Sequence, residues 1–205
     1  NLKINKKKFI YLISPNKIKN TFYEDLVKVL NSTKVSFFQL RLKKESFQNK
    51  IKIAKKIKII CKKFNVKFLI NDDPILTKKV NADGCHLGQK DMNINSARKI
   101  LKNKIIGITC HNSLKLAKTA IQNNANYIAF GAFYSTYTKK VKFKANIGLI
   151  RNFKKISNVP IVAIGGINNS NYKKLLLNKA DFLAISGYIW NNKKIKPFEA
   201  IEKLK

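Results

Sequence analysis

The stretch Val66-Lys-Phe-Leu-Ile-Asn-Asp72 is a short apolar run that ends in polar residues, and a second run, Gly84-Cys-His-Leu-Gly88, follows it along the chain. Six further runs of this kind are Phe9 to Ser14, Phe37 to Lys43, Ile105 to His111, Tyr127 to Gly131, Ile161 to Gly166 and Phe182 to Gly187. The segments between the runs carry apolar residues three and four positions apart, as in Phe47, Ile51 and Ala54, which is the spacing of an amphipathic helix. The sequence therefore predicts alternating strands and helices.

Strands that are apolar on both faces and alternate with helices are typical of a parallel sheet covered by helices. Eight such repeats predict an α/β fold of the closed (β/α)₈ TIM barrel type, with a doubly wound sheet as the alternative. The length of 205 residues is near the short end of the range for this barrel, so brief loops are expected. No Pro/Gly-rich linker or low-complexity segment divides the chain, and we expect residues 1–205 to form a single catalytic domain.

The net charge of +33 is the most unusual feature of the composition. An excess of cations is typical of proteins that bind nucleic acids, because Lys and Arg neutralise phosphates. Of the 43 basic residues, however, only Arg41, Arg98 and Arg151 are arginine, and the lysines are scattered over every predicted helix without interleaved aromatic residues. A solvated helix surface explains this distribution better, so no specific nucleic-acid partner is predicted. The charge should still attract anionic substrates and make binding sensitive to ionic strength.

The three cysteines, Cys61, Cys85 and Cys110, have neither the spacing of metal ligands nor an even count. This usage predicts buried thiols in a reducing compartment. No segment reaches the roughly 18 apolar residues of a membrane span, and the Lys-rich start lacks the hydrophobic stretch of a signal peptide. We therefore expect a cytoplasmic protein with no membrane partner, and a homo-oligomer is left open.

The run Phe37 to Lys43 alternates apolar and polar side chains, and side chains two positions apart lie on one face of a strand. Its apolar set is Phe38, Leu40 and Leu42, and its polar set is Gln39, Arg41 and Lys43. Because helices cover the outer face of a barrel, the polar set is expected in the lumen near its open end. Two buried cations without partners would cost several kcal/mol, so an anion is expected there. The alternative is a half-exposed strand end with solvated side chains.

Carboxylates are scarce, with only ten Asp and Glu in total, yet three of them lie near the ends of two neighbouring predicted strands. Oxygen ligands of this kind suit Mg²⁺, which is commonly held by one or two carboxylates together with phosphate oxygens. We expect Asp72 and Asp91 to bind the metal. Asp73, directly before Pro74, is more typical of a helix N-cap. His86 is expected to be a core histidine.

The later strand ends predict a second anion site. Gly165-Gly166 ends the seventh run, before a helix that is expected to begin near Asn168, and a glycine also ends the eighth run. In such barrels the loops after these two strands commonly bind a phosphate through backbone N–H groups and the N-terminus of a short helix. Thr136, Thr138 and Lys139 after the sixth strand could bond a small polar ligand and contact a phosphate. Two anion sites around one mouth predict two phosphorylated small-molecule substrates.

In their order along the chain, these motifs resemble those of the thiamine phosphate synthase family. The matching segments are Gln39 to Lys43 (Q-L/F-R-x-K in the family), Ile70 to Pro74 (I-N-D), Asp83 to Asp91 (D-G-x-H-x-G-Q-x-D), Ile106 to His111 (I-G-x-S-x-H), Thr136 to Lys139 (T-x-T-K) and Ala163 to Ile167 (A-I-G-G-I). The resemblance implies an enzyme that joins hydroxymethylpyrimidine diphosphate to hydroxyethylthiazole phosphate and releases pyrophosphate. It also implies a Mg²⁺ cofactor and a dissociative reaction through a pyrimidine carbocation.

The resemblance also implies roles for individual residues. Asp72 and Asp91 would hold Mg²⁺, and Arg41, Lys43 and Lys139 would be the catalytic cations that stabilise the leaving group. The pyrimidine diphosphate would contact Gln39, Leu40, Arg41, Leu42, Lys43, Asn71, Thr109 and Lys139. The thiazole phosphate would contact Thr136, Tyr137, Thr138, Gly166, Ile185 and Ser186.

The chain departs from the family pattern, which commonly has Glu at Leu42, Arg at Asp73, Ser at Thr109, Glu at Lys90 and Pro at Ser135. A thiazole tautomerase of the same superfamily, with a His at the place of His111, is an alternative function. Asp91 and the Thr136, Thr138 and Lys139 set favour the synthase, because the tautomerase branch typically lacks them. A basic nucleic-acid-binding protein on a relic barrel is the alternative from another class.

Overall fold

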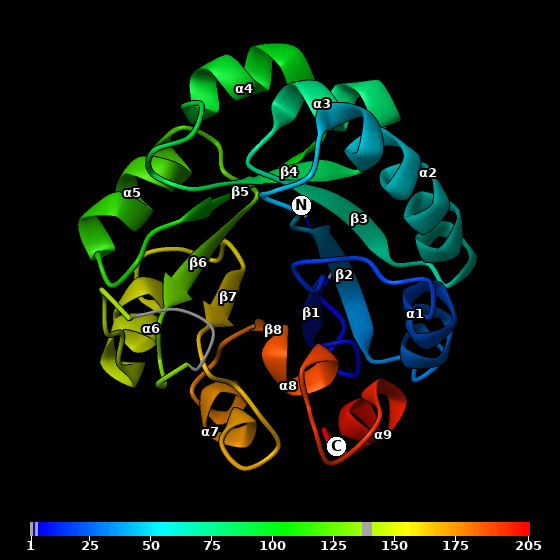
Figure 1. Ribbon diagram of the computed structural model, residues 1–205. Helices are drawn as coiled ribbons and strands as arrows, with labels where there is room; N and C mark the ends of the chain where they lie inside the picture. Colours follow the sequence, from blue (N-terminus) through cyan, green and yellow to red (C-terminus); the bar gives the residue numbers. More distant parts are fainter. Residues whose placement is uncertain (1, 3, 137–140) are drawn as a thin grey trace.

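The computed structural model describes residue 2, residues 4–136 and residues 141–205 of the chain. Eight parallel strands form a closed barrel in the order β1 to β8, with β1 paired to β8, and the helices surround it (Figure 1). The strands are β1 Ile10–Ile13, β2 Val35–Leu40, β3 Lys67–Asn71, β4 Gly84–Leu87, β5 Ile105–Thr109, β6 Tyr127–Gly131, β7 Ile161–Ile164 and β8 Phe182–Ile185. The predicted (β/α)₈ barrel is confirmed.

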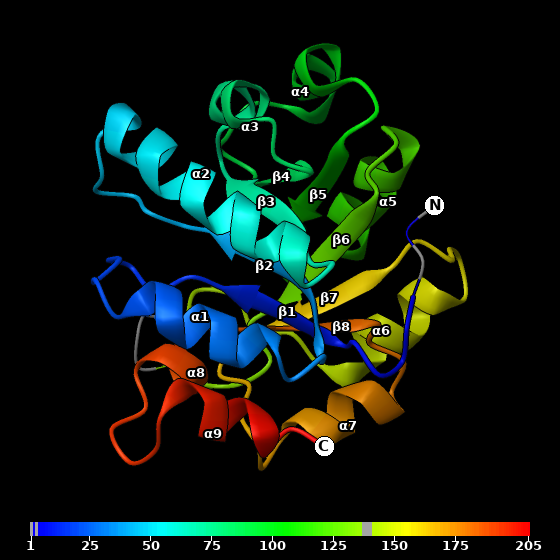
Figure 2. The same cartoon turned by 90° about the vertical axis from the view of Figure 1, so that its right-hand side faces the viewer.

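The helices are α1 Phe22–Leu30, α2 Phe47–Lys63, α3 Pro74–Val80, α4 Ile94–Leu101, α5 Leu114–Gln122, α6 Ile147–Lys154, α7 Tyr172–Leu177, α8 Gly187–Trp190 and α9 Pro197–Glu202. Several helices begin where a polar side chain accepts a hydrogen bond from a free backbone N–H group of the first turn. Ser46 does this for α2 and Asn93 for α4. Figure 2 shows the barrel from the side, with α1, α8 and α9 packed together. None of the helices in the described part of the chain is long and apolar enough for a bilayer crossing.

Several strands are a residue or two shorter than the predicted runs, and two differences in element ends bear on the site. Strand β2 ends at Leu40, three residues before Lys43, because the backbone N–H of Arg41 donates to the Ser14 side chain (2.8 Å) instead of to a neighbouring strand. Helix α7 begins at Tyr172 and not near Asn168, because the Asn168 side chain accepts the N–H of Ser170 and forms a turn first. The first difference places Arg41 and Lys43 in the turn at the barrel mouth.

The buried residues form two clusters. The larger one lies between the strands and the helices and contains Leu40 and Leu42, as the alternation in the run Phe37 to Lys43 predicts. The smaller one fills the lumen, and its large rings are Tyr11, Phe37 and Tyr127 together with Phe182. A filled lumen closes the barrel below its mouth, so the polar groups at the carboxyl ends of the strands form the available site.

Candidate active site

Two carboxylates meet where β3 and β4 reach the mouth. Asp72 has a left-handed backbone (φ 65°), and its N–H donates to the carbonyl of His86 (2.8 Å). Asp91 accepts a hydrogen bond from the N–H of Gly88 (2.7 Å), which turns its side chain back towards β4. Burial is the main cause that raises the pKa of the Asp91 carboxyl, and a hydrogen bond with Asp72 raises it further. The two side chains therefore lie together, as the sequence predicted.

The polar set of strand two converges on this mouth, although the predicted burial of both cations is wrong. Gln39 is buried in the lumen, and its side chain bonds Tyr11. Arg41 is half-buried, and its positive charge contributes to lowering the pKa of His86. The Lys43 side chain is 56% exposed and lies 3.4 Å from an Asp72 oxygen. The alternative expectation, partly exposed cations at the end of the strand, is thus correct. Arg41 and Lys43 lie just after the last residue of β2, where solvent reaches them.

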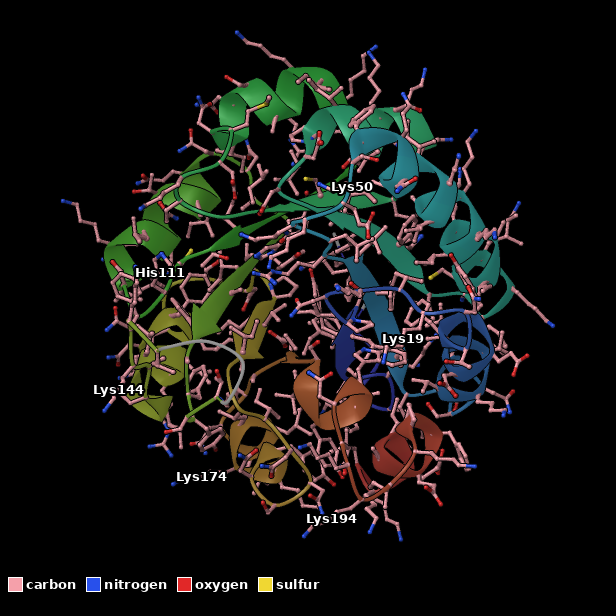
Figure 3. All side chains as sticks on the ribbon, in the orientation of Figure 1. Lys19, Lys50, His111, Lys144, Lys174 and Lys194 are labelled. Atoms are coloured by element: carbon pink, nitrogen blue, oxygen red, sulfur yellow. The ribbon has the colours of Figure 1, made fainter. Side chains whose placement is uncertain are left out.

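A cavity of about 310 Å³ opens beside these groups. It is lined by Leu40, Leu42, Lys43, Lys50, Ile70, Asn71, Asp72, Asp73 and Leu76. Lys50, labelled in Figure 3, adds a second lysine to Lys43 on the rim. The donor set contains two close carboxylates, and no group of three or more His, Cys, Asp or Glu side chains among the described residues is placed to hold a metal ion. Such a set fits Mg²⁺ that completes its shell with phosphate oxygens and water.

The second predicted site lies across the barrel, at the loops that follow β6, β7 and β8, which are named loops six, seven and eight. Gly165 and Gly166 have positive φ angles of 109° and 61°. A Cβ atom on Gly166 would lie 2.2 Å from the carbonyl oxygen of Ser135, so this glycine is required by the approach of loop six. Ser186 donates to the carbonyl of Ser14 (3.1 Å) and precedes the short helix α8. The side chain of Ile185 packs in the outer core, so its backbone is the part that reaches the mouth.

Loop six is described in part. Thr136 is half-buried beside this site, while Tyr137, Thr138 and Lys139 lie outside the described residues. Past that gap the ring of Phe143 stacks on His111 with the centroids 4.1 Å apart. The N–H of Ala132 donates to the carbonyl of Phe143 (2.8 Å). The end of the loop therefore returns to the rim beside β5.

A line of hydrogen bonds crosses the lumen just below the mouth. Gln39 Nε2 bonds the Tyr11 hydroxyl (2.7 Å), which bonds the Tyr127 hydroxyl (2.6 Å). Tyr127 bonds His86 Nδ1 (2.8 Å), and His86 Nε2 bonds Thr109 Oγ1 (2.8 Å). Burial lowers the pKa of His86 to about 4, so this ring is neutral at pH 7. The line joins two residues expected to contact substrate, Gln39 and Thr109.

Residues 10–189 match the sequence pattern of the family described as Thiamine monophosphate synthase. The chain belongs to the thiamine monophosphate synthase family. It is 71% identical over 204 residues to the thiamine-phosphate synthase of Pelagibacter ubique (strain HTCC1062), with 99% of this chain and 98% of that protein covered. It is 37% identical over 187 residues to the thiamine-phosphate synthase of Erythrobacter litoralis (strain HTCC2594), with 89% and 88% covered.

Solved structures agree with this assignment. A thiamine phosphate pyrophosphorylase from Pyrococcus furiosus has a TM-score of 0.84 and 26% identity, and the superposition covers 97% of this chain and 94% of that chain. A 3-hexulose-6-phosphate synthase has a TM-score of 0.66 at 15% identity, covers 95% of this chain and 98% of its own, and shares the fold alone. The chain is an enzyme of the thiamine monophosphate synthase family, a transferase.

Three departures from the pattern of the thiamine monophosphate synthase family have a structural explanation. Asp73 caps α3, because its Oδ1 accepts the N–H of Leu76 (2.8 Å), as the sequence predicted. Leu42 is buried among the helices and does not face the lumen. Thr109 keeps the hydroxyl of the usual serine, which bonds His86. Nothing in the structure explains Lys90 or Ser135, which are exposed.

Two polar groups of this thiamine monophosphate synthase family member, the hydroxyls of Tyr11 and Tyr127, are not anticipated by the sequence, because both residues lie in apolar strand runs. The expected core histidine is confirmed, since both ring nitrogens of His86 have hydrogen-bond partners. The sequence signal for these hydroxyls is the alternation of side chains between the two faces of a strand. Tyr11 lies two positions before Ile13, and Tyr127 lies two positions before Ala129, so each pair shares the lumen face. A hydroxyl on a buried face needs a partner, so two such tyrosines predict a polar connection across the lumen.

Neutral His86 should make stability depend on pH. Its pKa of about 4 in the folded chain lies below the usual 6.5, so the unfolded chain takes up the proton first as the pH falls. The stability that His86 confers is therefore present above pH 6.5 and is lost towards pH 4, by about 2 kcal/mol between pH 7 and pH 5. Urea unfolding of the wild type and of His86→Asn at both pH values measures this difference. Equal pH dependence in the two proteins would contradict a buried neutral ring.

Proposed function

We propose that the chain condenses hydroxymethylpyrimidine diphosphate with hydroxyethylthiazole phosphate, giving thiamine phosphate and pyrophosphate, with Mg²⁺ as cofactor. The observation that carries the proposal is the cluster of Lys43, Asp72 and Asp91 at the mouth. Two carboxylates in contact repel each other, which favours a bound cation or proton between them. A diphosphate that brings Mg²⁺ would neutralise this pair and be neutralised by the surrounding lysines.

The reaction is dissociative in this proposal: pyrophosphate leaves first, a pyrimidine-stabilised carbocation forms, and the thiazole nitrogen attacks it. Mg²⁺, when bound by Asp72 and Asp91, supplies positive charge to the diphosphate oxygens. Arg41 and Lys43 stabilise the charge that develops on the leaving group, and Lys139 is assigned the same role from its motif. No general base or covalent nucleophile is required, so the remaining residues bind and orient.

The two substrates are assigned to opposite sides of the mouth. Gln39, Asn71 and Thr109 would orient the pyrimidine near β2, β3 and β5, while Leu40 and Leu42 would contribute backbone atoms or the cavity wall. The thiazole phosphate would bind where β7 and β8 end, because backbone N–H groups there can receive a phosphate. Its proposed contacts are Thr136, Tyr137, Thr138, Gly166, Ile185 and Ser186.

The test is a product assay with both phosphorylated substrates. With Mg²⁺ present, we expect equal amounts of thiamine phosphate and pyrophosphate to form, as measured for both products by chromatography with mass detection. Omission of either substrate, or addition of a chelator, should abolish both products. Isomerisation of the thiazole substrate without condensation would instead support the tautomerase and overturn the proposal.

A further inference from the structure

The hydrogen bonds across the lumen form a line whose direction follows from the orientation of the Gln39 amide, whose nitrogen faces Tyr11, together with a count of protons. Burial raises the pKa of the Tyr11 and Tyr127 hydroxyls, so each keeps its one proton at neutral pH. The amide nitrogen of Gln39 donates to the Tyr11 oxygen, and the Tyr11 proton must then be donated to Tyr127. Tyr127 in turn donates to Nδ1 of His86, which therefore carries its proton on Nε2.

The same count determines what the two ends of the line present to the mouth. His86 Nε2–H donates to Thr109 Oγ1, so the hydroxyl proton of Thr109 remains available for another acceptor. At the other end the amide nitrogen of Gln39 is engaged, which leaves its Oε1 as an acceptor without a hydrogen-bond partner among the described residues. If the line ran in the other direction, Gln39 would present a donor and Thr109 an acceptor.

The rings in this line are held in place by packing as well as by hydrogen bonds. A Cβ atom on Gly107 would lie 1.8 Å from Cζ of Tyr127, so the tyrosine ring rests directly on the backbone of β5. His86 stacks on Tyr127 with the centroids 5.7 Å apart and an interplanar angle of 17°. Tyr11 packs on Phe37 at 5.4 Å. The hydroxyls therefore have little freedom to move when the ligand binds.

We propose that Tyr11 and Tyr127 are positioning residues that orient the Gln39 amide, so that its oxygen accepts a hydrogen bond from an amino group on the substrate ring. This inference rests on the proposed function, because the hydroxymethylpyrimidine of the proposed substrate is a pyrimidine ring that carries an amino group next to its hydroxymethyl group. A ring that carries an oxo group at the same place offers an acceptor and would meet the acceptor Oε1. The line of hydrogen bonds thus discriminates between amino- and oxo-substituted rings.

The experiment compares two substrates in the full-length enzyme: the aminopyrimidine diphosphate and its analogue with an oxo group in place of the amino group. The measured quantity is the ratio of kcat/KM for the amino to the oxo substrate. Any intrinsic difference in reactivity is the same in every variant, so a change in the ratio reports on the site. Tyr11→Phe removes the acceptor that holds Gln39 Nε2 and lets the amide turn. We expect the ratio to fall at least about tenfold.

Tyr127→Phe leaves Tyr11 in place but removes the partner of its proton, so the ratio should fall by a smaller factor, about threefold. The matched control is Tyr172→Phe, which removes a hydroxyl from an equally buried ring that bonds the backbone of Lys205 outside the lumen. Its ratio should stay within about twofold of the wild type. An unchanged ratio in Tyr11→Phe, whatever its overall rate, overturns the proposal. A wild type that forms no product overturns the proposed function instead.

The direction of the line can be tested without any substrate. The chain contains two histidines, so long-range ¹H–¹⁵N NMR spectra show two imidazole rings, and His111→Gln assigns them. We expect the His86 proton on Nε2 at neutral pH in the wild type, and a mixture of tautomers in Tyr127→Phe. A proton on Nδ1 of His86 in the wild type would reverse the line and overturn the inference, even if the enzyme were active.

Discussion

Asp72→Asn is expected to lower kcat about a thousandfold while leaving the fold intact. Asn has the shape of Asp and is well tolerated in the left-handed conformation that residue 72 adopts (φ 65°). The backbone hydrogen bond from residue 72 to His86 is also kept, since it uses the main chain. What is lost is the negative charge that attracts Lys43 and that, in the proposed function, would hold Mg²⁺ beside Asp91. A cation held by a single carboxylate would bind more weakly and would be poorly placed on the diphosphate.

The matched control is Asp73→Asn, the same substitution at the neighbouring residue. Asn is as good an N-cap as Asp, so α3 should keep its first turn, and activity should stay within about threefold of the wild type. Steady-state rates over a Mg²⁺ titration, with calorimetric binding of Mg²⁺ in the presence of pyrophosphate, measure both variants. Near-normal kcat in Asp72→Asn would remove the metal assignment. A large loss in Asp73→Asn would make that residue a ligand in addition to a cap.

The barrel could be predicted from sequence because its signal is repeated eight times and depends on side-chain burial alone. The carboxylate pair could be predicted for a related reason: consecutive parallel strands end at one edge, so Asp72 and Asp91 were expected near each other once the barrel was assumed. The exact end of β2 could not be predicted. It depends on the Ser14 hydroxyl, 27 positions away, which takes the N–H of Arg41 that would otherwise continue the ladder.

The polar line in the lumen was missed for a different physical reason. Tyr is both a strong strand former and an amphipathic residue, so in a run such as Tyr127 to Gly131 the ring predicts the strand and conceals the hydroxyl. Its partners, Tyr11 and His86, come from β1 and β4, and no local pattern relates them. Only the closure of the barrel brings β1 into the same layer as β4 and β6, so this part of the site is a property of the fold.

The large positive charge complicates any test of a single cation. A net charge of +33 attracts anionic substrates to the whole molecule, and the removal of any cation weakens that field slightly. A meaningful test of Arg41 must therefore compare it with another arginine whose removal changes the net charge equally. Arg151 meets this need, because it lies on α6 and bonds the Asn178 side chain (2.9 and 2.6 Å) away from the mouth.

Arg41→Ala is expected to lower kcat by a factor of about one hundred to one thousand, because the guanidinium can bind two oxygens of the leaving pyrophosphate at once. The backbone of residue 41 should stay in place, since its N–H remains bonded to Ser14. Arg41→Lys keeps the charge but not the planar pair of donors, and should lose about tenfold. Arg151→Ala should stay within about twofold. Rates measured at two salt concentrations separate long-range attraction from contact with the leaving group. If Arg41→Ala and Arg151→Ala lost equal activity, and if high salt removed both losses, long-range attraction would explain the role of Arg41.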